Sequence, residues 1–291
     1  MSKTDQQHRL ATGRLLAYDE HGEADGAPIF YFHGSPSARL EWYLFGTEAL
    51  AEKLKIRVIV PDRPGLGRSD FQPGRRIGDW PADVIALADH LALTRFAVVG
   101  YSGGGPYAAA CALKIPERLT HVGIVSGTGP FDEPGLSAAI NPSNLRFIEL
   151  SRTTPWLSRM MLRLMGVIVK RWPSRFITEA MAGLPATDQA VLARPDFQRA
   201  FVALIKEGLR SGPRGAQLDS ALMASPWDFR PQEIQVAVHL WHGEADANAP
   251  LAMGQYLATN IPNCRASFYP GEGHLSLMAK HVEEILNVLA A

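Results

Sequence analysis

A serine at position 102 lies in a glycine-rich turn whose residue types could support nucleophilic chemistry. The turn, Gly100-Tyr101-Ser102-Gly103-Gly104, fits the pattern G-x-S-x-G, which presents a serine hydroxyl at a sharp bend between a strand and a helix. Glycine is needed on both sides because side chains two residues before and two after the serine would collide with the neighbouring strand and helix. The same bend directs the backbone N–H of Gly103 at a developing oxyanion.

An ordinary glycine-rich turn with an unreactive serine is the alternative, and the five residues alone favour neither interpretation. The flanking sequence favours the catalytic one. An apolar run at 96–99 precedes the turn and an alanine-rich run at 106–112 follows it. These runs supply the strand and the helix that the bend must join.

A base and an acid are needed as well, because a serine hydroxyl is a weak nucleophile until a base takes its proton and an acid orients that base. His274 follows the last predicted strand, and Asp246 follows the strand before it. Asp132 and Glu244 are the alternatives for the acid. We favour Asp246 because its place gives the chain order serine, aspartate, histidine.

The elements that must position these residues alternate between strands and helices. Strands are predicted at 14–18, 29–32, 56–60, 96–100, 122–125, 236–241 and 265–269, and helices at 40–54, 82–91, 250–259 and 282–289. Strands that are apolar on both faces are typical of a parallel sheet covered by helices on two sides. Ligands bind such sheets beyond the carboxyl ends of the strands. The sequence places four polar residues there: His33, Asp62, Ser102 and Ser126.

This alternation stops between residues 132 and 225, where only helices are predicted, at 145–150, 155–172, 176–181, 188–192 and 197–210, with prolines between them. We predict a helical cap at 132–225, inserted into a core made of 1–131 and 226–291. Seven apolar cap residues could line a pocket, although packing inside the cap is the favoured role for each of them. They are Phe147, Trp156, Met160, Met161, Met165, Phe176 and Met181.

Together these motifs resemble those of α/β-hydrolase-fold proteins, and the resemblance covers nearly the whole chain. It rests on the turn at 100–104, on His33-Gly34-Ser35-Pro36, on the loop at 62–69, and on the segments 243–246 and 271–274. The family commonly carries a cap between its sixth and seventh strands. The resemblance implies an α/β fold with a mostly parallel, doubly wound sheet.

The resemblance also implies roles for single residues. Ser102 would attack an acyl carbonyl, His274 would accept the serine proton and pass it to the leaving group, and Asp246 would orient His274. The backbone N–H groups of Gly103 and Ser35 would form the oxyanion hole. His33 is expected to position the oxyanion loop. Epoxide hydrolases of this fold use an aspartate as the nucleophile, and Ser102 at that position disfavours their chemistry.

Composition limits the partners. Lys and Arg number 29 and Asp and Glu also 29, so the formal net charge is zero and the sequence indicates neither a nucleic-acid surface nor a polybasic membrane patch. The histidines lack metal-ligand spacing, and the two cysteines, Cys111 and Cys264, imply no disulfide framework. The polar N-terminus lacks a signal-peptide run. We expect a cytoplasmic protein with a small-molecule substrate, no membrane insertion, no metal and no cofactor, and an oligomeric state that the sequence leaves open.

Three functions remain compatible with these residues. The leading one is a serine hydrolase that cleaves a small, fairly apolar carboxylic ester or a related acyl compound through a Ser-His-Asp triad and an acyl-enzyme. The second uses the same three residues on a C–C bond or an amide, or as an acyltransferase or perhydrolase, because the fold does not decide the reaction. The third is a ligand-binding protein with little turnover.

Overall fold

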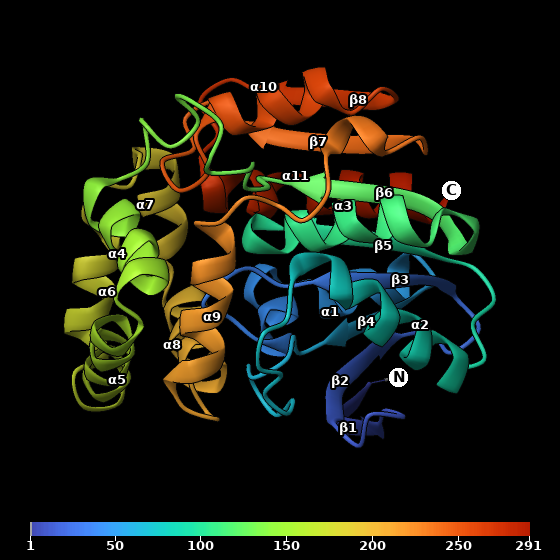
Figure 1. Cartoon of the computed structure of the whole chain (residues 1–291), viewed down its shortest axis with the longest axis horizontal. Coiled ribbons are helices and arrows are strands. Elements are labelled where there is room, and N and C mark those ends of the chain that lie inside the picture. The colour runs from blue at the N-terminus through green and yellow to red at the C-terminus, as the bar shows by residue number, and fades with distance from the viewer. Residues whose placement is uncertain (1) are drawn as a thin grey trace.

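Eight strands form one sheet in the order β1-β2-β4-β3-β5-β6-β7-β8 in the computed structural model, which describes residues 2–291 (Figure 1). The strands from β3 to β8 are parallel to one another, whereas β2 is antiparallel to both β1 and β4. This confirms the predicted fold class. The strands are β1 (Lys3–Arg9), β2 (Leu15–Gly22), β3 (Ala27–Phe32), β4 (Ile56–Pro61), β5 (Phe96–Tyr101), β6 (Leu119–Val125), β7 (Val238–Gly243) and β8 (Cys264–Tyr269).

Helices cover both faces of the sheet, which explains why its central strands are apolar throughout. Every residue of β5 is buried. One face packs against α2 (Trp80–His90), α3 (Gly105–Lys114) and α10 (Leu251–Asn260), and the other packs against α1 (Glu48–Lys53) and α11 (His274–Ala290). Two-sided burial is the arrangement that continuous apolar strands require.

Two parts of the N-terminal third differ from the sequence-based expectation. The polar segment Lys3–Arg9 forms β1, an edge strand that is largely exposed, so it carries no apolar pattern by which to predict it. The prediction of a single helix at 40–54 is wrong. A 3-10 helix at Arg39–Phe45 is followed by α1, and Gly46, with a φ of 68°, ends the first of the two. Such a left-handed residue is a common helix stop.

The C-terminal helix was also predicted too short. Its expected start was near Val282, but α11 begins at His274. The residues before it, Gly271 and Gly273, form the turn that joins β8 to this helix. The histidine expected in a loop therefore occupies the first turn of a long helix.

Six helices lie between β6 and β7 in the chain, and we call them the cap helices. They are α4 (Pro142–Thr153), α5 (Pro155–Arg171), α6 (Pro173–Met181), α7 (Ala186–Leu192), α8 (Pro195–Gly208) and α9 (Pro213–Met223). Five of them begin with proline, which suits the first helical position because its missing N–H would have no partner there. Figure 1 shows the cap helices stacked beside one end of the sheet. Of these helices, α9 was not predicted.

The domain boundaries predicted at 131/132 and 225/226 remain a proposal, although all the cap helices fall inside 132–225. Within residues 2–291, none of the helices combines the length and the apolar character needed to span a bilayer.

Candidate active site

Ser102 lies at the bend between β5 and α3, as the sequence predicts. Its φ of 55° is left-handed, a conformation that a non-glycine residue adopts at a cost and that recurs at functional sites. A Cβ added to Gly100 would lie 2.2 Å from the carbonyl oxygen of Gly104, and one added to Gly104 would lie 2.1 Å from that of Phe32. Both glycines are therefore required by close backbone approach.

His274 follows strand β8 and Asp246 follows strand β7. Their side chains are in contact. Nδ1 of His274 lies 2.7 Å from Oδ2 of Asp246, and both side chains are buried. The other carboxylate oxygen of Asp246 accepts hydrogen bonds from the backbone N–H groups of Asn248 and Ala249, each at 2.8 Å. These bonds leave Oδ2 free to face the imidazole.

The charges of this pair act on each other. Burial lowers the pKa of His274, but the charge of Asp246, the hydrogen bond to it and the charges of Asp188 and Glu41 raise it, so the net pKa is above the ordinary value. Burial raises the pKa of Asp246, but His274, His242 and the N–H of Ala249 together lower it below the ordinary value, so this carboxyl is ionised. The arrangement stabilises the imidazolium that forms when a histidine takes up a proton.

The two alternative acids are not at this position. Asp132 and Glu244 have exposed side chains, whereas Asp246 is the carboxylate that contacts the imidazole of His274. The structure thus pairs His274 with Asp246 and places Ser102 in the lining of the same cavity as His274, while the catalytic roles of the three residues remain predictions.

Asp188, on cap helix α7, holds the start of α11 and was missed by the sequence analysis. Its carboxylate accepts hydrogen bonds from the backbone N–H groups of His274 at 2.8 Å, Leu275 at 3.0 Å and Ser276 at 2.9 Å. The first N–H groups of a helix lack partners within the helix, and a carboxylate there also suits the helix dipole. No local pattern could reveal this contact, because the partners are about 86 residues apart.

Glu41, in the 3-10 helix after β3, fixes the oxyanion loop at residues 33–36. Its carboxylate accepts hydrogen bonds from the N–H of Gly34 at 2.8 and 3.0 Å, from the hydroxyl of Ser37 at 2.8 Å and from that of Tyr31 at 3.0 Å. Burial raises the pKa of Glu41 despite these bonds. The N–H of Gly34 is therefore occupied, which leaves that of Ser35 as the candidate donor of this loop.

A buried ion pair fixes the same loop from its other side. Arg63 donates to the carbonyl oxygens of His33 and Gly34, the latter at 2.7 Å, and it contacts Asp219 of cap helix α9 at 2.7 Å. The Gly34 carbonyl belongs to the same peptide group as the N–H of Ser35. A guanidinium on that oxygen fixes the plane of the peptide and increases the positive character of its N–H.

Asp219 is shared with a second guanidinium. Arg75 contacts it at 2.6 Å, and Tyr107 donates its hydroxyl to it at 2.7 Å. Burial would raise the pKa of Asp219, but the charges of Arg63 and Arg75 hold it far below its ordinary value. The cap therefore supplies the counter-charge for two arginines beneath the oxyanion loop.

Two other polar residues named from the sequence, His33 and Asp62, have structural contacts. His33 is fully buried beside Arg63, and burial together with that charge holds the pKa of His33 well below its ordinary value, so it is neutral. Arg39 pairs with Asp62 at 2.7 Å, away from the cavity. Cys111 is buried, which raises the pKa of its thiol well above the usual range. Residues 2–291 hold no cluster of His, Cys, Asp or Glu suited to a metal ion.

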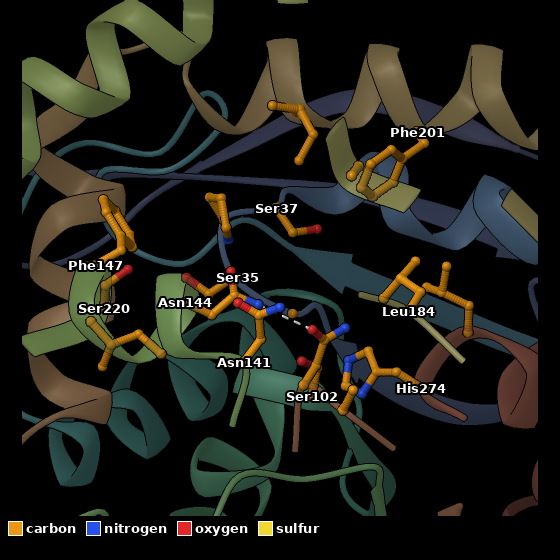
Figure 2. A pocket seen from close by; sticks show the side chains of 18 of the residues that line it. Ser35, Ser37, Ser102, Asn141, Asn144, Phe147, Leu184, Phe201, Ser220 and His274 are labelled. Atoms are coloured by element: carbon orange, nitrogen blue, oxygen red, sulfur yellow. Dashed lines mark hydrogen bonds between the residues drawn. The ribbon is translucent and has the colours of Figure 1, made fainter. Parts of the chain in front are cut away.

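A cavity of about 630 Å³ lies between the strand ends and the cap helices and includes Ser102 and His274 in its lining (Figure 2). Apolar side chains dominate the cap side, among them Phe147, Ile148, Phe176, Leu184, Leu192 and Phe201. Neutral polar side chains also line the cavity: Asn141, Ser143, Asn144 and Ser220 from the cap, and Asn248 from the loop after β7. Among the described residues that line this cavity there is no lysine or arginine.

The cap residues predicted as possible pocket residues divide into three groups. Phe147 and Phe176 line the cavity. Met165 and Met181 pack within apolar clusters of the cap. Trp156, Met160 and Met161 do neither, because they are exposed on α5.

Residues 29–288 match the model of the alpha/beta hydrolase family. The chain belongs to the alpha/beta hydrolase family. A 2-hydroxymuconate semialdehyde hydrolase from Pseudomonas putida is 27% identical over 276 residues, which is 92% of this chain and 88% of that protein.

Solved structures agree with this assignment. A thermophilic esterase from Thermogutta terrifontis superposes with a TM-score of 0.69 over 98% of this chain and 100% of its own, at 23% identity. The structure titled "Est816 as an N-Acyl homoserine lactone degrading enzyme" covers 97% of this chain and 99% of its own, with a TM-score of 0.68 and 25% identity. The proteins that this chain resembles thus include a 2-hydroxymuconate semialdehyde hydrolase, an esterase and a lactone-degrading enzyme.

Proposed function

We propose that this protein is a serine hydrolase that cleaves a neutral carboxylic ester with an apolar acyl part, through an acyl-enzyme. The observation that carries the proposal is a largely apolar cavity that includes Ser102 and His274 and has no lysine or arginine among its described lining residues. A carboxylate moved from water into such a cavity would lose hydration without gaining a counter-charge. A neutral substrate avoids that cost.

In the proposed mechanism Ser102 attacks the acyl carbon while His274 takes the hydroxyl proton. The N–H groups of Gly103 and Ser35 donate hydrogen bonds to the oxyanion. One such donor typically lowers the activation barrier by about 3 kcal/mol. His274 then gives the proton to the leaving alcohol. Asp246, 2.7 Å away, stabilises the imidazolium in both steps. Water activated by His274 cleaves the acyl-enzyme.

The polar part of the cavity suggests where a second neutral group of the substrate binds. Asn144 donates to Asn248 at 3.2 Å, and Asn248 is two residues from Asp246. Together with Asn141 these amides offer donors and acceptors without charge. An amide or a lactone carbonyl next to the scissile ester would suit them, and the similarity to the lactone-degrading structure fits such a substrate.

C–C bond hydrolysis is the second candidate, because the relative that matches 92% of the chain is named for 2-hydroxymuconate semialdehyde. That compound carries a carboxylate. The described cavity lining offers it no lysine or arginine, and for this reason we rank the ester reaction first.

The test is turnover of p-nitrophenyl esters from acetyl to long acyl chains, beside turnover of a 2-hydroxy-6-oxodienoate. We expect ester turnover to peak at one chain length and to fall by at least about 10³-fold in Ser102→Ala. Ser143→Ala, which changes another serine of the cavity lining, is the matched control and should retain activity. Faster turnover of the dienoate than of every ester would refute the proposal and favour the second candidate.

A further inference from the structure

The outer face of cap helix α5 exposes apolar side chains that a folded protein normally buries. Among residues 2–291, the exposed large apolar side chains all lie between positions 156 and 172: Trp156 (67% exposed), Met160 (53%), Met161 (40%), Leu164 (59%), Val167 (53%) and Trp172 (54%). An apolar cluster of this kind on one face marks an interaction site.

The spacing along the helix makes this face continuous. Positions 156, 160, 164 and 167 follow the i, i+4, i+8, i+11 pattern that places side chains on one side of an α-helix. The opposite side of α5 carries Leu162 and Val169, which are buried in the cap. The helix therefore has two apolar faces, and only one of them is covered by the cap.

The charge around this face has one sign. From Leu150 to Thr178 the sequence contains Arg152, Arg159, Arg163, Lys170, Arg171 and Arg175, and no Asp or Glu, in a chain whose formal net charge is zero. Arg175 is paired with Glu179, and Arg159 with Gln217. Within residues 2–291 the side chains of Arg163, Lys170 and Arg171 have no ion-pair partner.

We propose that the outer face of α5 docks on an anionic lipid bilayer, with the helix lying in the plane of the interface. Apolar side chains enter the boundary between head groups and acyl chains, while the unpaired cations contact lipid phosphates. Trp156 and Trp172, at the two ends of α5, suit that boundary because their rings are apolar with one polar N–H. A 17-residue helix with these charges would lie on the bilayer and would not span it.

Charge argues against a second copy of the chain as the occupant. Two α5 faces brought together would place Arg163, Lys170 and Arg171 of one copy against the same residues of the other, with no acidic residue between 150 and 178 to offset them. Like charges held close together are destabilising. An anionic surface removes this conflict.

The experiment is flotation of the full chain with phosphatidylcholine vesicles that contain or lack phosphatidylglycerol. We expect binding to the anionic vesicles only, reduced by high salt, and weakened at least about tenfold in Arg163→Glu/Lys170→Glu. Lys114→Glu/Lys206→Glu, which makes the same charge change at exposed positions of α3 and α8, is the matched control and should bind nearly as well as the wild type.

A second variant separates interfacial insertion from surface charge alone. Leu164→Ser/Val167→Ser keeps every charge and should also lose most of the binding. Circular dichroism melts establish that each variant is folded, independently of any enzymatic activity. No binding by the folded wild type, or unchanged binding by Leu164→Ser/Val167→Ser, would overturn the proposal. Self-association that this variant abolishes, without vesicle binding, would assign the face to a second copy instead.

Discussion

Asp188 provides a direct test of how the cap supports the predicted base. Its buried carboxylate accepts three backbone N–H groups at the start of α11, at 2.8, 3.0 and 2.9 Å. In Asp188→Ala these donors lose their partner. With about 1 kcal/mol for each hydrogen bond lost, the unfolding free energy should fall by roughly 3 kcal/mol. Asp188→Asn keeps an acceptor oxygen and should lose less.

The charge of Asp188 gives the substitution a second consequence. Burial lowers the pKa of His274, and Asp246 and then Asp188 raise it. Because the carboxylate of Asp188 favours the imidazolium, Asp188→Asn should lower the pKa of His274. A base must be unprotonated to accept the serine proton, so the acid limb of kcat/KM should move to lower pH.

The assay combines urea unfolding with the pH dependence of kcat/KM for a p-nitrophenyl ester. Asp196→Asn is the matched control: it removes a carboxylate from the exposed first turn of cap helix α8, where it pairs with the exposed Arg194. It should change the unfolding free energy by no more than about 0.5 kcal/mol and leave the acid limb unchanged. Our interpretation fails if Asp188→Asn leaves the acid limb where it is in the wild type and Asp188→Ala loses less than about 0.5 kcal/mol, the scale of an ordinary surface substitution.

Three further outcomes are expected. Asp219→Ala leaves the guanidinium groups of Arg63 and Arg75 buried without a counter-charge, so the unfolding free energy measured in urea should fall by about 3–5 kcal/mol. A fall near zero would exclude the proposed support of the oxyanion loop. Gly104→Ala puts a Cβ 2.1 Å from a carbonyl oxygen and should lower stability by about 3 kcal/mol, read from thermal melts; a native-like melt would contradict the required close approach. Asp246→Asn removes the charge that raises the pKa of His274, so kcat should fall about 10⁴-fold and any residual activity should extend to lower pH; an unchanged rate would assign the acid elsewhere.

Local sterics and chain order made much of the fold predictable. The bend around Ser102 could be predicted from its five residues together with the apolar runs on either side. Its two glycines are required because backbone atoms lie 2.2 and 2.1 Å from where a Cβ would be. The strand end that carries Asp246 could be found because β7 is a buried, largely apolar run. Strand β8, before His274, is largely exposed and was located by the turn residues at 270–273 that end it. Edge strand β1 has no such run, and it was missed for that reason.

Contacts between distant segments could not be read from the sequence. Asp188 and Asp219 lie in cap helices, and the groups they hold, the start of α11 and Arg63, are about 86 and 156 residues away. The start of α11 at His274 was missed for a related reason, since the carboxylate that caps it comes from the cap and not from the preceding turn.

The sequence by itself determined the α/β sheet, the bend at Ser102 and the order of the three predicted catalytic residues, because each depends on neighbouring residues or on apolar periodicity. Between residues 150 and 178 the sequence also has six cationic residues and no Asp or Glu. This local excess of positive charge is not visible in the zero net charge of the whole chain. Only the tertiary structure decided which face of α5 stays exposed and which buried charges support the oxyanion loop. A helix with apolar residues on two sides can bury either one, and the packing of the other cap helices selects between them.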